Sequence, residues 1–527
     1  MTHDPERPTD TDFLPDELEE ALAATNLETS PGTQLRDEGD ERRAMDLGAP
    51  VAGLAVVDEA ALGSGSSDLS ILERRPSARE PRPYRFPAFE RQRLDNGLTL
   101  IHAHLPGRPL LSAQLLLEGG GCREPADVAG VTALTGRALS EGTHHRDAIE
   151  LVEAAERLGA ELHAEAGWES LSASLEVPRS RMAPALMLLA EMALTPSLPE
   201  VEVERLRAER LNDLLQVRAD PRRRAERVFA ETIYAPTSPF SRPLGGVEST
   251  VAAIGRDQVA ARHAAHLDPR RATLVVAGDL AGLPLRTLVE DAFGRWSGPA
   301  AQGHPVAGQT PEASAVDASP HPAGARIVLV DRPGSAQTEV RVGHVGLSRL
   351  IPDFHAVAVL SSVLGGLFNS RLQRLLREDR GYTYGIHAGF DLRRWPGPFA
   401  ARTAVQTEVT VPALHDLMGE LRRIREAAPE ESELREARDY LIGVFPLRFE
   451  AAPQVVSAIV GLVLFGLPDD ELDRYRPAIA EVTAEDVYDA SRHVRPDDAS
   501  IVLVGDASRI EGDLRTAGLG AVSLITD

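Results

Sequence analysis

The order of apolar strands and amphipathic helices along the chain occurs twice. In the first half, Arg91–Ile101 has the pattern of a strand, an Asn-Gly turn and a second strand. Leu111–Leu117 predicts a further strand, and Arg271–Asp279 predicts a buried strand that precedes a last helix reaching Phe293. Apolar residues at helical spacing between these strands predict the helices Asp127–Leu139, Ala148–Leu158, Arg179–Leu194, Glu200–Val217, Arg222–Ile233 and Asp257–Leu267.

The second half repeats this order after a stretch rich in Pro, Gly, Ala and Ser. Ala325–Asp331 and Gln337–Val345 predict strands, Phe354–Leu367 predicts a helix, and Asp498–Asp506 predicts a terminal strand. The terminal strand echoes Arg271–Asp279, with Ala-Ser-Ile-Val-Leu-Val-Gly-Asp against Ala-Thr-Leu-Val-Val-Ala-Gly-Asp. We infer two copies of one α+β unit of about 200 residues, each with one sheet and helices packed on a face.

Composition divides the chain into four segments. Residues 1–85 form a polar, acidic tail that we expect to be disordered. Residues 86–297 and 324–527 are the two predicted domains, and residues 298–323 are the linker between them. Residues 1–80 carry 19 Asp and Glu against 7 Arg, which is half of the formal net charge of −24. The remainder is only mildly acidic, which argues against nucleic acid as a partner, because binding to phosphates needs a basic face.

Single features of the sequence exclude several classes of protein and site. The lone Cys122 excludes an internal disulfide and a cysteine-based zinc cluster, and a thiol without a placed base is more often inert. The first residues lack the basic and apolar regions of a secretory signal. The longest apolar run, Val455–Leu467, is interrupted by Ser457 and is too short to span a membrane, so it fits a buried core helix. We therefore expect a cytoplasmic protein without a membrane partner.

One helix–strand junction in the second half carries two strong hydrogen-bond donors. The stretch from Leu372 begins as a helix with an apolar stripe, Gly381 ends it, and Tyr382–Tyr384 begins a strand. Arg377 therefore lies near the helix end and Tyr384 just beyond the break, where both side chains could face one cleft. From spacing alone, a surface ion pair and a tyrosine in a sheet are the more ordinary interpretation, because helix–glycine–strand junctions are common.

Motifs in both halves are shared with a known family. They are Leu94-Asp-Asn-Gly-Leu-Thr-Leu, Gly130-Val-Thr-Ala-Leu-Thr-Gly-Arg-Ala-Leu-Ser-Glu-Gly-Thr143, Leu364-Gly-Gly-Leu-Phe-Asn-Ser-Arg371 and Leu376-Arg-Glu-Asp-Arg-Gly-Tyr-Thr-Tyr384. On these motifs, residues 88–520 resemble a two-domain half-subunit of the M16 (pitrilysin/insulinase-like) metallopeptidase family. The resemblance implies an α+β fold of two homologous domains, each a mostly antiparallel sheet with helices packed on a face, as in M16/LuxS-like metallohydrolases. It also implies that Arg377 and Tyr384 help to hold and polarise the scissile peptide.

The same resemblance implies that this chain has lost its zinc site. Active members carry His-x-x-Glu-His on a helix, where the histidines bind zinc and the Glu activates water. The corresponding residues here are Ala133, Gly136 and Arg137, which offer no ligand or base. The family's third ligand falls at Leu214, and the adjacent Asp213 is turned about 100° away on the helix. We expect no metal or cofactor on this chain, and zinc on a partner subunit.

Other histidines do not rebuild a metal site in the sequence. His144 and His145 are adjacent, so their side chains point apart on a helix or a strand, and no second pair lies nearby. His163 and His355 are isolated in sequence. We expect these histidines to be surface or packing residues.

The resemblance leads to one main hypothesis on function and two alternatives. In several M16 peptidases two homologous half-subunits close face to face, one with the zinc helix and the other with the Arg/Tyr pair. We therefore expect a non-catalytic subunit of a heteromeric M16-type zinc metallopeptidase. Arg377 and Tyr384 would complement a homologous zinc-bearing partner, with a peptide or unfolded protein as substrate. The alternatives are a structural or assembly protein, for which a homodimer is possible, and a peptide-binding module that delivers a precursor peptide to another enzyme.

Overall fold

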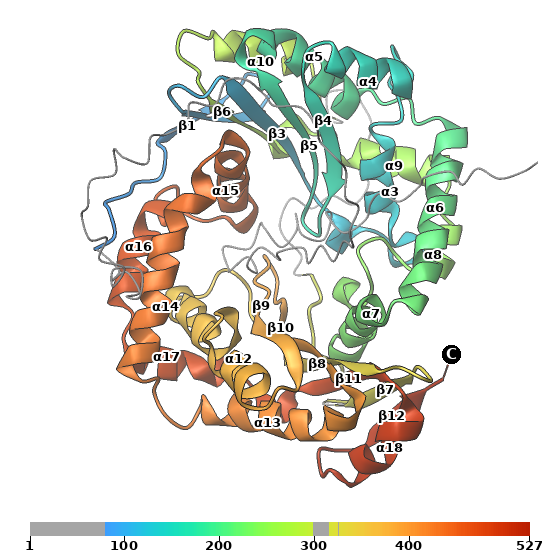
Figure 1. The fold of residues 1–527 in the computed structure, drawn as a ribbon. Coiled ribbons are helices and arrows are strands. Elements are labelled where there is room, and N and C mark those ends of the chain that lie inside the picture. The colour runs from blue at the N-terminus through green and yellow to red at the C-terminus, as the bar shows by residue number, and fades with distance from the viewer. Residues whose placement is uncertain (1–79, 299–315, 325, 527) are drawn as a thin grey trace, which may run out of the picture. The chain divides into compact units, whose positions relative to one another are not determined.

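Two six-stranded sheets form the framework of the structure, a computed structural model that describes residues 80–298, 316–324 and 326–526. Most of the predicted tail and of the predicted linker lies outside the described residues. The chain from Arg85 onward belongs to one unit, and the colours of Figure 1 follow its course from the first sheet to the second. The boundaries of the two domains stay a prediction.

The first sheet has the strand order β1-β2-β6-β3-β5-β4. All neighbours are antiparallel except β2 and β6, which are parallel. The central strand β6 is buried along its whole length, as its apolar sequence predicts. The strands are β1 (Phe89–Arg93), β2 (Thr99–His104), β3 (Leu110–Glu118), β4 (Glu161–Ala166), β5 (Ser170–Pro178) and β6 (Ala272–Gly278).

The second sheet repeats this arrangement with the order β12-β7-β11-β8-β10-β9. Strand β7 is parallel to both β12 and β11, and the remaining neighbours are antiparallel. The two strands with echoing sequences, β6 and β11, both stand third in their sheets, so the α+β fold with two homologous, mostly antiparallel sheets is confirmed. The strands are β7 (Ile327–Asp331), β8 (Gln337–Val345), β9 (Thr383–Phe390), β10 (Pro398–Gln406), β11 (Ser500–Gly505) and β12 (Val522–Ile525).

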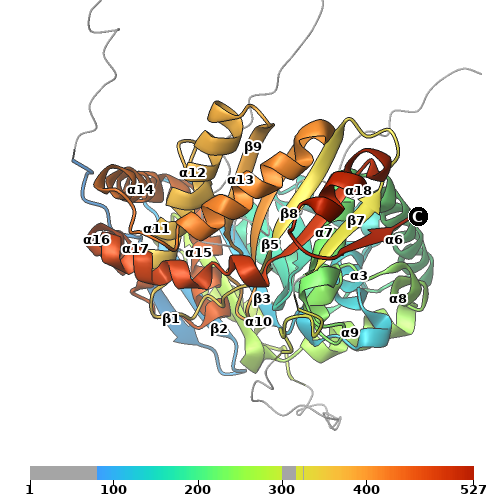
Figure 2. The same cartoon turned by 90° about the horizontal axis from the view of Figure 1, so that it is seen from below.

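Helices of the same half cover one face of each sheet. In the first half α5 and α10 pack over the apolar core of the sheet, and in the second half α13 and α18 lie across the sheet, as Figure 2 shows. The first-half helices are α3 (Val131–Ala138), α4 (Ala148–Glu156), α5 (Met182–Leu194), α6 (Glu200–Ala219), α7 (Pro221–Ile233), α8 (Glu248–Ala252), α9 (Arg256–His266) and α10 (Leu285–Phe293). The second-half helices are α11 (Phe354–Ser361), α12 (Arg371–Gln373), α13 (Thr410–Arg423), α14 (Glu431–Val444), α15 (Ala452–Phe465), α16 (Glu471–Glu481), α17 (Ala484–Ala490) and α18 (Ala507–Thr516).

The opposite face of each sheet is covered by a helix from the other half. Helix α7 packs on β8 and β11, where Val228 and Phe229 join Val502 and Val504 in one buried cluster. Helix α15 packs on β3 and β6, which hold the equivalent places in the first sheet (Figure 1). The apolar run predicted as a core helix is thus α15, and its burial comes from the sheet of the other half.

Within the part of the chain that the structure describes, no single helix is both long and apolar enough to cross a membrane. Among the described helices, one pair, Glu431–Phe449 and Ala452–Phe465, is together long and apolar enough to cross a membrane, but the pair is bent by 112° at the break between its helices.

A buried histidine in the second sheet favours its neutral form. His344 on β8 is 3% exposed, and its Nδ1 lies 2.9 Å from the carbonyl oxygen of Val345. Its Nε2 accepts a hydrogen bond from the backbone N–H of Arg495 at 3.0 Å, so the ring fits as the neutral Nδ1–H tautomer. Burial, assisted by the nearby Arg495 guanidinium, lowers the pKa of His344 to about 4.

The free energy of unfolding is therefore expected to fall as the pH drops from about 6.5 towards 4, because the unfolded state binds the proton first. Urea unfolding of the wild type and of His344→Gln over this interval measures the effect. The variant should lose less stability, by up to about 1.4 kcal/mol per pH unit. The exposed His145→Gln serves as the control and should keep the wild-type slope. Equal slopes for wild type and His344→Gln would contradict the assignment.

Candidate functional site

Arg377 and Tyr384 lie beside each other at one edge of the second sheet. Arg377 is in a π-helical turn, Arg374–Asp379, and Tyr384 is the second residue of the edge strand β9. The guanidinium carbon of Arg377 is 5.6 Å from the centroid of the Tyr384 ring. The Tyr384 side chain is 92% exposed. The structure therefore brings the two predicted site residues together on the surface.

Two local features of the sequence produce this placement. Gly381 has a φ of +63°, a left-handed conformation that ends the helix as predicted. The backbone N–H of Tyr382 donates to the carbonyl oxygen of Leu376 at 2.9 Å, which closes the last, wide turn. Leu372 and Leu376 are fully buried and hold this helix against the core, so that Arg377 points away from it.

Phe368 is a third member of this surface group, and the sequence analysis missed it. Its ring is 64% exposed and lies 4.6 Å from the guanidinium carbon of Arg377, within the range of a cation–π contact. The Arg377 guanidinium therefore contacts two exposed rings. Phe368 belongs to the motif Leu364–Arg371, but an apolar residue in a motif gives no sign of being exposed.

The four positions that the resemblance assigns to the zinc motif carry side chains without metal-binding atoms. Ala133, Gly136 and Arg137 lie on α3, and Leu214 on α6 is 0% exposed. At Gly136 a β-carbon would meet the backbone nitrogen of Ala166 at 3.2 Å, which is tighter than an ordinary contact, so a longer side chain there needs β4 to move. The side chains at these four positions are a hydrogen, a methyl, a guanidinium and an isobutyl group, and none of them can coordinate zinc.

An ion-pair network joins the two helices that carry these positions. Arg137 on α3 donates to Glu209 on α6 at 2.7 Å. Arg205 on α6 forms ion pairs with Glu202 and Glu209 on the same helix and with Glu141, which follows α3. The Arg137 cation is thus paired with the Glu209 carboxylate where the resemblance places a metal.

The remaining candidates for chemistry show ordinary surroundings. His144 and His145 are exposed and line a surface hollow of about 500 Å³ together with Glu141 and Glu202. Burial, reinforced by Glu169, raises the pKa of the Cys122 thiol to about 12, which suppresses the reactive thiolate. Among the described residues, no group of three or more His, Cys, Asp and Glu side chains is placed to hold a metal ion.

Comparison with known proteins gives matches over both halves. The family model for insulinase (peptidase family M16) matches residues 100–244, and the model for the peptidase M16 inactive domain matches residues 253–441. An uncharacterized zinc protease of Mycobacterium tuberculosis is 25% identical over 407 residues, covering 77% of this chain and 91% of the relative. The non-peptidase homolog YmxG of Helicobacter pylori is 21% identical over 409 residues, covering 76% and 90%.

Solved structures share the fold. The crystal structure of a peptidase M16 inactive domain from Pseudomonas fluorescens has a TM-score of 0.70 at 24% identity, covering 79% of this chain and 98% of that one. The crystal structure of a protease from Helicobacter pylori has a TM-score of 0.73 at 16% identity, covering 80% and 100%. With both halves matched by family models, the chain belongs to the M16 peptidase family.

Proposed function

We propose that this chain is the non-catalytic subunit of a heteromeric M16-type zinc metallopeptidase. The observation that carries the proposal is a contrast within the chain. The pair of a half-buried Arg377 and an exposed Tyr384 is present, whereas Ala133, Gly136 and Leu214 leave the zinc motif without ligand or base. A homologous partner would supply zinc and the general base, and this chain would supply hydrogen-bond donors.

The chemistry of peptide hydrolysis gives such donors a role. Attack on an amide places negative charge on the carbonyl oxygen, and a preorganised donor aimed at that oxygen contributes about 3 kcal/mol. The contact of Arg377 with Glu378 is a long 3.5 Å ion pair, which leaves guanidinium N–H groups for an external acceptor. Tyr384 offers a phenolic hydroxyl on the same surface.

A second candidate function is a structural or peptide-binding role without any part in peptide hydrolysis. The ion pair between Arg137 and Glu209 favours it, because it links α3 to α6 without a metal. The similarity to a relative described as a non-peptidase homolog also supports it. In this case Arg377 and Tyr384 would bind a peptide or pack against a partner.

The decisive experiment measures zinc content and peptidase activity of the purified chain, alone and mixed with a zinc-bearing M16 homologue. Activity that arises only on mixing, from a chain without zinc of its own, supports the complementing subunit. Stoichiometric zinc on the chain alone would overturn the assignment of the four motif positions. Assembly without activity would favour the structural or peptide-binding role.

A further inference from the structure

The exposure of Tyr384 depends on one irregular place in the second sheet. Along β9 and β10, Thr403 pairs with Ile386, but Val405 pairs with Thr383. Two residues of β9, Tyr384 and Gly385, therefore stand opposite one residue of β10. This is a β-bulge, which inserts one residue and re-aims the side chains around it.

Without the extra residue, Tyr384 would point into the protein. Side chains two apart in a regular strand share a face, and Ile386 is buried at 2% exposure. The inserted residue resets the alternation, so that Tyr384 turns outward and reaches 92% exposure. The bulge thus decides whether the hydroxyl of Tyr384 reaches solvent.

The first sheet provides an internal comparison. Its edge strand β4 holds the place of β9, and its register with β5 runs from Glu161 to Ala166 without a shift. Going backwards from β4, Leu162 is half-buried, Glu161 is exposed and Ala160, just before the strand, is buried, as regular alternation requires. The shift is therefore a feature of the strand that carries Tyr384 and not of the repeated unit.

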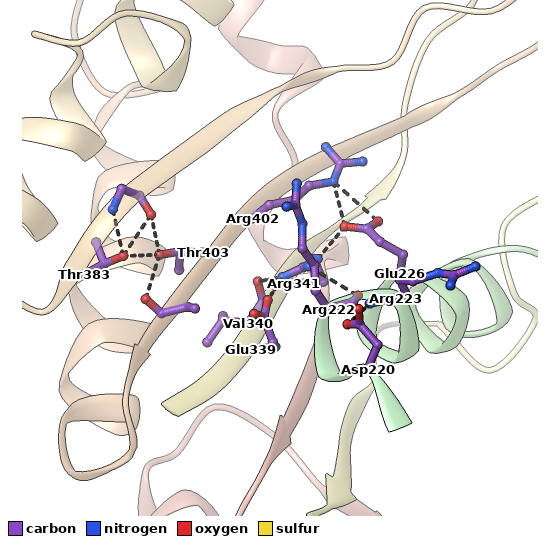
Figure 3. Close-up of polar contacts among 12 residues, drawn as sticks. Asp220, Arg222, Arg223, Glu226, Glu339, Val340, Arg341, Thr383, Arg402 and Thr403 are labelled. Carbon is purple, nitrogen blue, oxygen red and sulfur yellow. Dashed lines mark hydrogen bonds and ion pairs between the residues drawn. The ribbon is translucent and has the colours of Figure 1, made fainter. Parts of the chain in front are cut away.

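Two threonine hydroxyls hold the bulge in place (Figure 3). Thr403 Oγ1 lies 2.8 Å from Thr383 Oγ1 and 2.8 Å from the Gly385 carbonyl oxygen. Thr383 Oγ1 lies 2.8 Å from the same carbonyl oxygen and accepts from the Gly385 N–H at 3.1 Å. Both backbone polar groups of Gly385, left out of the regular ladder, are thereby satisfied by side chains.

We propose that Thr383 and Thr403 are positioning residues, whose hydroxyls fix the bulge and so present Tyr384 to the bound peptide. This inference rests on the proposed function for the role of Tyr384 and on the β9–β10 register for its geometry. Loss of the Thr403 hydroxyl would remove its hydrogen bonds to Thr383 Oγ1 and to the Gly385 carbonyl oxygen, so the Thr383 hydroxyl alone would hold the bulge. We expect β9 then to shift towards the regular register with β10, in which Tyr384 would be buried.

The test compares Thr403→Val, which removes the hydroxyl and keeps the branched shape, with Thr403→Ser, which keeps the hydroxyl. The control is Thr410→Val, which removes another buried Thr–Thr hydrogen bond of the same half, 3.0 Å long, to Thr338. The first readout is kcat and KM of the chain reconstituted with a zinc-bearing M16 subunit and a fluorogenic peptide. The second is the ¹⁹F NMR signal of 3-fluorotyrosine inserted at position 384, which needs no turnover.

Thr403→Val is expected to lower kcat about tenfold, because misplacing a positioning group costs rate rather than assembly. It should also shift or split the ¹⁹F signal, and Thr403→Ser should restore both readouts. Thr410→Val should change neither. An unchanged ¹⁹F signal in Thr403→Val, or an equal loss of kcat in Thr410→Val, would overturn the inference.

The two proposals fail in distinguishable ways. If Tyr384→Phe leaves turnover unchanged while Thr403→Val alters the ¹⁹F signal, the bulge is held as inferred and the proposed function is wrong. If Tyr384→Phe lowers turnover while Thr403→Val changes neither readout, the proposed function stands and the positioning role is wrong.

Discussion

Arg377→Ala is expected to lower kcat of the reconstituted peptidase by about 10²- to 10³-fold, the cost of removing one donor to an oxyanion. The guanidinium contacts the exposed rings of Phe368 and Tyr384 at the surface, so its loss removes the cation and is expected to leave the backbone in place. Tyr384→Phe removes only a hydroxyl, and we expect a smaller loss in the same direction. The measurement is kcat and KM with a fluorogenic peptide, and size-exclusion chromatography shows that assembly is intact.

The matched control for Arg377 lies one turn earlier on the same helix. Arg374 is an exposed arginine, and its Nη2 makes only a marginal contact of 3.5 Å with the Asn369 carbonyl oxygen. Arg374→Ala removes the same charge from the same surface without touching the rings, so we expect turnover within about twofold of wild type. Equal losses in both variants would indicate a general charge effect, and unchanged turnover in Arg377→Ala would remove its assigned role.

Glu226→Ala is expected to lower the free energy of unfolding by about 3 kcal/mol, the lower end of the cost of breaking a buried ion pair. Glu226 projects from α7 onto the second sheet, where it meets Arg341 on β8 and Arg402 on β10 (Figure 3). Arg341 is 2% exposed, so removal of this carboxylate leaves a buried cation with Glu339 as its remaining carboxylate among the described residues. Glu226 itself is 38% exposed, and this places the cost at the lower end.

Urea denaturation of the full chain measures this effect. Glu209→Ala is the control, because Glu209 also pairs with two arginines, yet all three side chains are at least 42% exposed. Exposed pairs contribute about 1 kcal/mol or less, so the control should remain close to wild type. If Glu209→Ala lowers the free energy of unfolding as much as Glu226→Ala does, the ion pair between Glu226 and Arg341 is not what stabilises the packing of α7 on the second sheet.

The pH dependence of the same contact has a defined sign. Burial disfavours the Glu226 carboxylate, but attraction to Arg402 and Arg341 outweighs burial, and the pKa of Glu226 is lowered. Its contribution to stability is therefore complete above about pH 4.3 and is lost as the pH falls further, because the unfolded state takes up the proton first. Glu226→Gln should flatten the acid limb of a stability profile.

Much of the architecture could be predicted from the sequence, because the same order of strands and helices occurs in both halves of the chain. The echo between the strands around Val275 and Val502 gave the repeat, and both strands occupy the third place in their sheets. Strand β4 was missed, because Glu161–Ala166 is rich in Glu and Ala, which are depleted in strands. Its strand conformation comes from pairing with β5, a tertiary contact that local composition does not contain.

The candidate site was readable only in part. The glycine at position 381 and the leucine stripe placed Arg377 and Tyr384 at a helix–strand junction, and the structure has them there. The outward turn of Tyr384 depends on a one-residue shift of register, and regular alternation would have paired it with Ile386 on the buried face. The ion-pair partner of Arg137 could not be predicted either, because Glu209 lies 72 residues away in sequence.

The crossing of α7 and α15 to the opposite sheets makes the two halves depend on each other. Each half completes its core with a helix of the other, and the two helices occupy equivalent strands. Such a reciprocal exchange of helices resembles domain swapping, here between the two halves of one chain. Neither half covers both faces of its own sheet, so each depends on the other for a complete core.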